Sequence, residues 1–199
     1  MIEKLLRNLQ DKEVERRIIG KEINSWRDKI DGLMETVSDF ETSRSILQKA
    51  SQITQEKLSF HVSNVVSNAL VAVFDDPYKF KVDFVTRRNV TECDLLFVRN
   101  DNDMPPLDSC GYGTADIASL ALRVAFWKLE GDAANTLVMD EPTRNLSIDK
   151  QPLASEMIKQ LSEMLGLQFI IVTHNEALTE SADKVFKVTH DKYSTVSEV

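Results

Sequence analysis

Apolar residues recur along the first 57 positions at alternating steps of three and four, in one continuous frame. The frame keeps its phase where Lys12, Arg16 and Arg44 occupy it, and charged residues flank it on both sides. Heptads of this kind predict a coiled-coil helix, about 80 Å long at 1.5 Å per residue. Its apolar positions are Ile2, Leu5, Leu9, Ile19, Ile23, Trp26, Ile30, Leu33, Val37, Phe40 and Leu47.

A coiled coil needs a second strand, and no other stretch of this sequence carries heptads. Either two copies pair, or the partner helix lies on another polypeptide. The alternative is a long amphipathic helix that folds back on the rest of the chain; the narrow seam and its charged flanks favour a projecting arm. We therefore expect an arm over residues 1–57 and a globular lobe over residues 58–199.

Behind the arm, the pattern predicts a helix and then a hairpin. A broad apolar face continues from Leu58 to Phe74, and Pro77 marks its end. Alternating residues predict strands over 78–84 and 92–98, joined by a turn at 87–89 and followed by a loop over 100–106. The hairpin holds the densest basic cluster of the lobe, which we interpret as a solvated face rather than a DNA-phosphate patch: Lys79, Lys81, Arg87, Arg88 and Arg99.

Two apolar runs, residues 136–140 and 167–172, have the composition of parallel strands buried on both faces. An amphipathic helix, roughly residues 150–165, lies between them. Strand, helix and strand form a parallel crossover, which delivers the polar residues after both strands to one edge of the sheet. We therefore expect Asp140, Glu141 and His174 to meet.

These polar residues suit phosphoryl chemistry. Asp140 provides the oxygen ligand that Mg²⁺ prefers, and Glu141 can polarise a water for in-line attack on a phosphoryl group. For the run 136–142 alone, a core strand followed by a solvated turn is an equally good reading.

A glycine-containing stretch over 107–129 is the remaining candidate site. We expect Gly111 and Gly113 to adopt positive φ and to aim backbone N–H groups at an anion, with Thr114 as the N-cap of the helix that follows. An ordinary glycine turn before a helix is the alternative. Further on, the pattern predicts a short helix over 176–182, a strand over 184–188 and a polar tail from Asp191.

Taken in order, these segments resemble the ABC-type ATPases. Asp140-Glu141-Pro142-Thr143 and the later Val-Thr-His at 172–174 are similar to the Walker B, D-loop and switch-histidine motifs, and residues 111–123 are similar to the signature loop and helix of the SMC-like branch. The best likeness is to SbcC-type double-strand-break repair ATPases, including phage versions. It runs from about residue 58 to the C-terminus, and the arm also fits.

The resemblance implies an α/β fold, the C-terminal lobe of an ABC-type P-loop ATPase with parallel core strands, preceded by a long coiled-coil helix. It also implies ATP and Mg²⁺ as ligands. The residues concerned are Asp140 for the metal, Glu141 as general base, His174 as γ-phosphate sensor, and Gly111, Gly113, Thr114 and Ser147 for nucleotide contact.

This sequence departs from the family pattern at three positions. Gly111 stands where the signature serine is usual, Tyr112 replaces the first signature glycine, and Ser147 replaces the D-loop aspartate. No GxxxxGK[ST] P-loop occurs anywhere in the chain. The chain therefore has the metal and base side of an ATP site without the cradle for the β- and γ-phosphates, and we expect it to be inactive alone.

The expected function is the C-terminal half of a composite, dimeric ATPase for DNA-end processing, repair or recombination. Its partners would be an N-terminal ATPase lobe (in the same longer protein or on a separate chain), a second copy, a SbcD-type nuclease as exonuclease subunit, and DNA. The alternative is a non-catalytic coiled-coil interaction protein with a degenerate ATPase-like lobe.

Composition agrees with an intracellular setting. The net charge of −8 argues against a generally basic surface, so any DNA contact needs a local patch or a partner. Two cysteines fit neither a disulfide framework nor a CxxC metal site. No apolar run has the length of a membrane helix, and no signal-peptide core is present. We expect a cytoplasmic or nucleoid-associated protein, and a phage-encoded one is possible.

Overall fold

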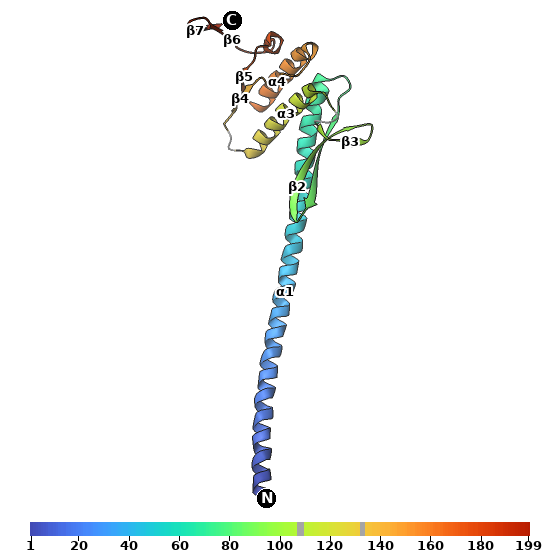
Figure 1. Cartoon of the computed structure of the whole chain (residues 1–199), viewed down its shortest axis with the longest axis vertical. Helices are drawn as coiled ribbons and strands as arrows, with labels where there is room; N and C mark the ends of the chain where they lie inside the picture. The colour runs from blue at the N-terminus through green and yellow to red at the C-terminus, as the bar shows by residue number, and fades with distance from the viewer. Residues whose placement is uncertain (107–109, 132–133) are drawn as a thin grey trace. The chain divides into compact units, whose positions relative to one another are not determined.

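The computed structural model describes residues 1–106, 110–131 and 134–199; Leu107, the expected start of the glycine-containing stretch, lies outside these ranges. Within them the chain divides into two compact units, Met1–Thr54 and Gln55–Val199 (Figure 1). The elements are α1 (Ile2–Val73), β1 (Lys79–Arg87), β2 (Val90–Arg99), β3 (Asn102–Met104), α3 (Tyr112–Glu130), β4 (Thr136–Asp140), η1 (Ile148–Lys150), α4 (Gln151–Leu165), β5 (Gln168–Val172), η2 (Glu176–Thr179), β6 (Phe186–His190) and β7 (Ser194–Glu198).

The first unit is helical and belongs entirely to α1. Every apolar residue of the predicted seam is exposed; Ile19 is 48% exposed and Leu47 is 70% exposed. A coiled-coil partner would cover this seam. The division into an arm over 1–57 and a lobe over 58–199 stays a prediction. None of the described helices has the length and apolar character needed to cross a membrane.

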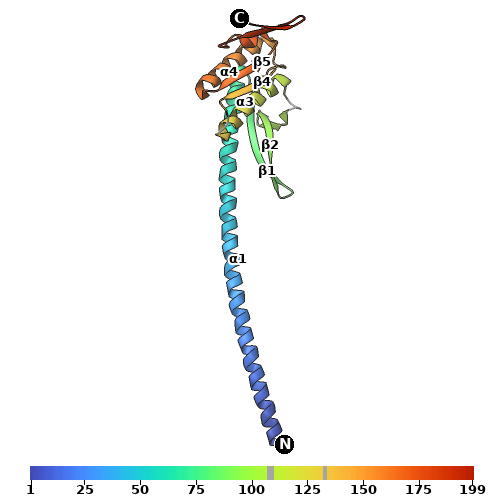
Figure 2. The same ribbon diagram turned by 90° about the vertical axis from the view of Figure 1, so that its left-hand side faces the viewer.

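A separate helix after residue 57 was expected, but α1 runs unbroken to Val73. Its apolar residues become buried only in the second unit, at Val62, Val66, Ala69, Leu70 and Val73. These residues share one core cluster with Phe80, Val82 and Phe97 of the β1–β2 hairpin. The hairpin lies along this part of α1 in every view (Figures 1 and 2).

The hairpin is antiparallel and presents one apolar face to α1. Phe80 pairs with Phe97 across the two strands, and both side chains are buried. Their rings meet edge to face at 5.6 Å between centroids. The turn has Arg88 and Asn89 at φ of 51° and 62°, the left-handed geometry that joins strands tightly.

Three serines of α1 satisfy the outer edge of β1. They recur every fourth residue, so they lie on one helical face. Ser59 Oγ donates to the carbonyl of Val82 (2.5 Å), and Ser63 Oγ accepts from the N–H of Val82 (3.0 Å). Ser67 Oγ accepts from the N–H of Phe80 (2.9 Å). Hydroxyls thus take the place of a neighbouring strand on an edge that would otherwise lack partners.

The basic cluster of the hairpin is largely neutralised by nearby carboxylates. Lys81 lies 2.7 Å from Asp103, Arg87 contacts both Glu92 and Asp94, and Arg99 pairs with Asp76. This pairing agrees with the solvated face that the sequence favoured over a DNA-phosphate patch.

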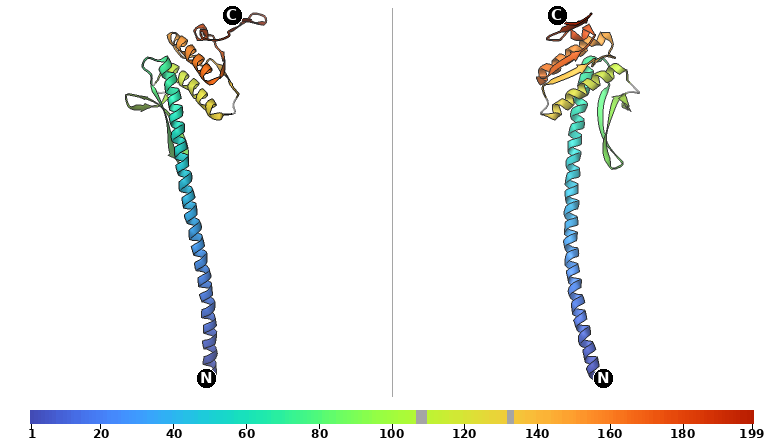
Figure 3. Two further views of the ribbon diagram at one scale, coloured as in Figure 1. Left: turned by 180° about the vertical axis from the view of Figure 1, so that it is seen from behind. Right: turned by 60° about the vertical axis from the view of Figure 1, so that its left-hand side comes forward.

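Strands β4 and β5 pair in parallel, with Leu137 opposite Phe169 and Met139 opposite Ile171. These four side chains join the core with residues of α3 and α4. The two helices lie on one side of the strand pair in the left panel of Figure 3. The expectation that both strands are buried on both faces is wrong. On the other face Val138 is 68%, Ile170 46% and Val172 58% exposed, because no described element covers it.

The C-terminal segment is a second antiparallel hairpin. Beyond the expected strand near 184–188, β7 pairs with β6, so that Val188 lies opposite Val196. The sequence had suggested a polar tail there instead. Its short alternation over 194–198 is weak, since only Val196 is apolar.

We predict that Ser63→Ala destabilises the second unit by about 1 kcal/mol, because the buried-edge N–H of Val82 loses its acceptor. Urea unfolding would measure this change. Asn64→Ala is the matched control, since Asn64 is the next residue of α1 and is exposed. Equal midpoints for the two variants would contradict a role for the serine row.

Candidate active site

Glu141 sits where β4 ends and the backbone changes direction. Its N–H continues the parallel ladder by donating to the carbonyl of Val172 at 2.9 Å. Its φ is +45°, an uncommon value for a residue other than glycine. This conformation breaks the alternation of the strand and turns the Glu141 side chain toward the residues that follow β5.

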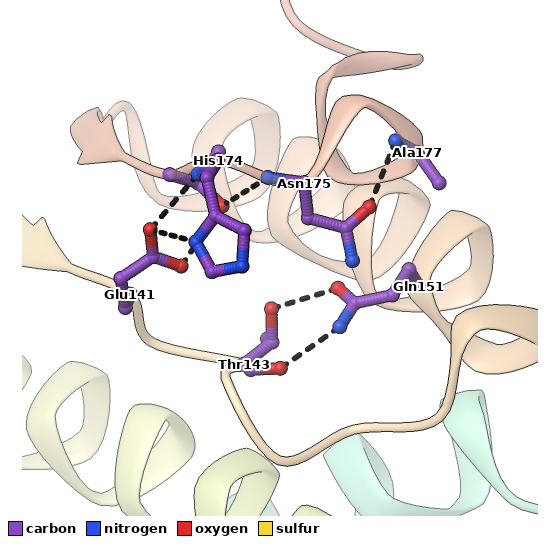
Figure 4. A network of polar contacts seen from close by, with 7 residues as sticks. Glu141, Thr143, Gln151, His174, Asn175 and Ala177 are labelled. Atoms are coloured by element: carbon purple, nitrogen blue, oxygen red, sulfur yellow. Dashed lines mark hydrogen bonds and ion pairs between the residues drawn. The ribbon is translucent and has the colours of Figure 1, made fainter.

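Three groups bind the Glu141 carboxylate. Oε1 accepts from the backbone N–H of His174 at 2.8 Å and lies 2.7 Å from the imidazole Nδ1, while Oε2 accepts from Thr173 Oγ1 at 3.1 Å (Figure 4). The prediction that Asp140, Glu141 and His174 meet at one edge of the sheet is therefore confirmed for Glu141 and His174 only.

These contacts keep Glu141 ionised. Burial raises the pKa of the carboxyl, but hydrogen bonds from the His174 ring, the His174 backbone and Thr173 outweigh burial and leave the pKa below its ordinary value. The site thus holds a carboxylate at neutral pH, the protonation state that a general base or an orienting group requires.

His174 is anchored at one end and open at the other. Its side chain is 81% exposed, although Nδ1 is held by Glu141. When Nδ1–H donates to the carboxylate, Nε2 of the neutral ring is free to accept a proton or to bind a ligand. The following turn is fixed because Asn175 N–H donates to Thr173 Oγ1 and Asn175 Oδ1 accepts from Ala177 N–H, both at 3.1 Å (Figure 4).

Asp140 lies apart from this pair. Its side chain is exposed on the uncovered face of the strand pair, where its neighbour across the ladder is Val172. Within the described ranges it makes no hydrogen bond or ion pair to Glu141 or His174. One exposed carboxylate fits Mg²⁺, which keeps several waters and takes one or two carboxylates together with phosphate oxygens. The described residues contain no group of three or more acidic, histidine or cysteine ligands.

The glycine stretch differs from expectation in its backbone. Gly111 has φ −63°, and helix α3 already begins at Tyr112, so neither Gly111 nor Gly113 has positive φ and Thr114 is not the N-cap. Gly111 itself occupies the N-cap position, and its carbonyl accepts from Thr114 N–H at 3.0 Å. Within the described residues, no hydrogen bond or ion pair joins this turn to Glu141 or His174.

Gly113 is required by packing. A Cβ built on it would lie 2.9 Å from the carbonyl oxygen of Asn145 and 3.0 Å from the Cα of Leu146. The first turn of α3 therefore lies directly against the loop 142–147. That loop leads to Ser147, which is exposed at the start of η1. The structure thus brings together two motifs that are separate in the sequence: the glycine stretch at Gly113 and the loop 142–147 that ends at Ser147.

Sequence reasoning missed four polar residues around these motifs: Asp116, Thr143, Gln151 and Thr173. Gln151 and Thr143 are buried, at 1% and 2% exposure. One signal was available for Gln151: it precedes Ala154 and Ile158 by three and seven residues, so a polar side chain falls on the buried stripe of α4.

The sequence is similar to archaeal DNA repair ATPases, although no protein-family model matches it. It is 34% identical over 95 residues to the DNA double-strand break repair Rad50 ATPase of Saccharolobus solfataricus, a match that covers 48% of this chain. It is 28% identical over 153 residues to the Rad50 ATPase of Sulfolobus acidocaldarius, covering 72% of this chain. The chain spans only 11% and 17% of the lengths of these relatives.

The fold is that of SMC head domains. The Smc head domain with a coiled coil and joint from Pyrococcus yayanosii superposes with a TM-score of 0.62, at 18% identity, covering 94% of this chain and 35% of that one. A structure from work on ATP-driven dimerization and DNA-stimulated activation of SMC ATPases gives a TM-score of 0.58 at 16% identity, covering 74% and 88%. The predicted α/β lobe behind a long helix is thereby confirmed as a fold.

We predict that Gly113→Ala destabilises the lobe, although alanine is the better helix former by about 1 kcal/mol. The new methyl group would press on the Asn145 backbone, which is not a flexible side chain. Gly111→Ala is the matched control, because nothing lies within 4 Å of a Cβ there. Thermal unfolding of the two variants shows whether packing or helix propensity determines the effect. A Gly113→Ala variant more stable than the wild type would contradict the packing argument.

The lowered pKa of Glu141 predicts a pH-dependent contribution to stability. An ionised Glu141 stabilises the fold fully above the ordinary carboxyl pKa of 4.5, and this stabilisation is lost as the pH falls through the lower pKa of the folded state. The urea midpoints of the wild type and Glu141→Gln should therefore differ at pH 5 and converge in more acidic buffer. Glu180→Gln serves as control; a Glu141 difference that persists unchanged in acid would refute the assignment.

Proposed function

We propose that this chain, an SMC/Rad50-like ATPase segment by sequence and fold, supplies the Walker B and switch-histidine half of a composite ATP site. Similarity to Rad50 ATPases and to SMC head domains confirms the resemblance to the SMC-like branch of the ABC-type ATPases. The other half of the site would come from a P-loop-bearing lobe, in the same longer protein or on a separate chain.

The observation that carries this proposal is the Glu141–His174 pair at the ends of two parallel strands. Ligands of open α/β sheets bind outside the carboxyl ends of the strands. Here that edge presents an ionised carboxylate held by Thr173 and an imidazole whose second nitrogen is open. A terminal phosphate and a water molecule at this edge would meet both groups.

The uncovered face of β4 and β5 supports a missing lobe. Parallel sheets occur with both faces covered, and two strands alone do not form a complete sheet. Val138, Ile170 and Val172 are all exposed on this face, beside Asp140. Because the sequence contains no GxxxxGK[ST] motif, we assign the covering element to the lobe that brings the P-loop.

Each residue then has a role in phosphoryl transfer. Asp140 would hold the water shell of Mg²⁺, which neutralises charge on the phosphates when bound. Glu141 would take a proton from the water whose oxygen attacks the γ-phosphorus, and the bond to the ADP oxygen would break in line. With Nδ1–H held by Glu141, Nε2 of His174 would donate to a γ-phosphate oxygen when the ring carries a second proton, and would accept from the attacking water when it does not.

The second copy of the chain would dock through the α3 turn and the adjoining loop. Gly111, Gly113, Thr114 and Ser147 lie on these two neighbouring segments. We assign Tyr112 and Thr114 to the contact with the second copy, since Gly113 packs against the loop 142–147 of its own chain. ATP-driven dimerization is a property of an SMC ATPase with this fold, and we extend it to this chain. DNA and a SbcD-type nuclease complete the proposed assembly.

The altered signature positions favour one competing function. Gly111 and Tyr112 replace the serine and first glycine of the usual loop, so a lobe that no longer uses nucleotide would keep only its coiled-coil interactions. Such a protein would bind its partner equally with and without ATP.

The test uses the chain together with a P-loop-bearing lobe, sought first in the neighbouring coding sequence as a GxxxxGK[ST] lobe that ends in heptads. We predict association that requires ATP and Mg²⁺, measured by light scattering after gel filtration, and turnover only in the mixture. Glu141→Gln should lower turnover by about 10²- to 10⁴-fold while the ATP-bound assembly persists.

Two results would overturn the proposal. One is ATP hydrolysis by the purified chain alone that Glu141→Gln abolishes. The other is association that ATP does not change, which would favour the interaction protein. Glu180→Gln is the matched control, because Glu180 is an exposed carboxylate to which no role in the site is assigned.

A further inference from the structure

The loop 142–147 is held by side chains from two different helices. It begins after Glu141 and ends at Ser147, so it connects the two places where the chain would meet nucleotide. Its own backbone forms successive turns: Arg144 N–H donates to the carbonyl of Glu141 (3.2 Å), and Leu146 N–H donates to that of Thr143 (3.0 Å). Neither turn alone fixes the loop against its surroundings.

Gln151 of α4 fastens the loop from inside. Its Nε2 donates to the carbonyl of Thr143 (2.8 Å) and its Oε1 accepts from Thr143 Oγ1 (2.8 Å) (Figure 4). Nε2 also donates to the carbonyl of Leu146 (3.1 Å). Gln151 is 1% exposed, so these bonds do not compete with water. An amide is the group that satisfies all three partners, since it offers two donor hydrogens and one acceptor.

Asp116 of α3 fastens the same loop from the other side. Its Oδ2 accepts from the backbone N–H of Asn145 at 2.7 Å, and its Oδ1 accepts from Asn145 Nδ2 at 3.3 Å. Gly113, one turn earlier, lets the Asn145 carbonyl approach α3 closely. The loop is therefore bound to α4 through Thr143 and Leu146, and to α3 through Asn145.

We propose that Gln151 and Asp116 are positioning residues that hold the loop 142–147 in one conformation before nucleotide binds. Through this loop they fix the position of Ser147 relative to Glu141. They also fix the first turn of α3 relative to the same loop. Neither residue contacts the Glu141 carboxylate or His174, so both act through the backbone. We call these bonds from Gln151 and Asp116 to the loop the clamp. Its role in catalysis rests on the proposed ATPase function, whereas its role in holding the loop does not depend on that function.

The first experiment measures amide hydrogen exchange in the chain without nucleotide. In Gln151→Met, which keeps the length and apolar bulk but loses all three bonds, exchange at Arg144, Asn145 and Leu146 should rise by about tenfold or more. Asp116→Ala should raise exchange at Asn145 most, because it removes that acceptor. Amides in the middle of α3 and α4 should change far less.

Ser155→Ala is the matched control. Ser155 is another buried polar residue of α4, but it bonds the Leu178 carbonyl (2.7 Å) and Ser181 N–H (3.0 Å) instead. This variant should loosen 176–183 and leave 142–147 protected. Equal loosening of both segments by Gln151→Met and Ser155→Ala would mean general destabilisation and would overturn the proposal.

Gln151→Glu tests whether position 151 acts by hydrogen bonding, because it predicts a pH dependence of loop protection that a residue acting only by filling space would not show. A carboxylate at this position can accept from Thr143 Oγ1 but cannot donate to the two carbonyls, whereas the protonated acid can donate to one of them. Protection factors of the loop amides in this variant should therefore recover as the pH is lowered. Those of Gln151→Met should not recover, and parallel pH profiles in the two variants would count against the clamp.

The last measurement is made in the assembly with the P-loop lobe. Gln151→Met and Asp116→Ala should lower the ATP turnover rate several-fold with little change in the ATP concentration for half-saturation, because neither residue is placed in contact with nucleotide. A change confined to half-saturation would overturn the positioning role. If the wild-type assembly shows no turnover, the proposed function fails while the exchange results still decide whether the clamp exists.

Discussion

The parallel pairing of β4 with β5 is the constraint from which the site follows. The register sets Asp140 opposite Val172, so the next residues of both strands emerge at the same edge. Glu141 then continues the ladder through its N–H and turns its carboxylate onto Thr173 and His174. A shift of one residue would place these side chains on the opposite face, and the carboxylate–imidazole pair would be lost.

In the part of the chain that the structure describes, the same pairing leaves the two strands covered on one face only. One face of the two strands closes on α3 and α4, and the other exposes valine and isoleucine beside Asp140. The exposed apolar sheet face and the absence of a GxxxxGK[ST] motif from the sequence both fit the proposal of a separate P-loop lobe. A covering lobe that carries a P-loop would bury the face and bring the triphosphate to the exposed Asp140 and His174.

Polar side chains on helices satisfy backbone groups at two places in the lobe. Ser59, Ser63 and Ser67 satisfy the edge of β1, and Gln151 and Asp116 satisfy the loop behind Glu141. Each is a short or buried group on a helix, so its geometry is set by the packing of that helix. In this way the loop next to the candidate site is hydrogen-bonded to both α3 and α4.

Periodicity and local chemistry determined much of this protein. They predicted the long helix, the crossover unit and the meeting of Glu141 with His174, since these depend on apolar spacing and strand direction. Tertiary packing decided the rest. Gly113 is needed because Asn145 lies against it, Thr114 is not a cap because α3 starts earlier, and the β4–β5 pair stays open on one face. None of these follows from sequence spacing, because each depends on which segments distant in the chain come into contact, or fail to.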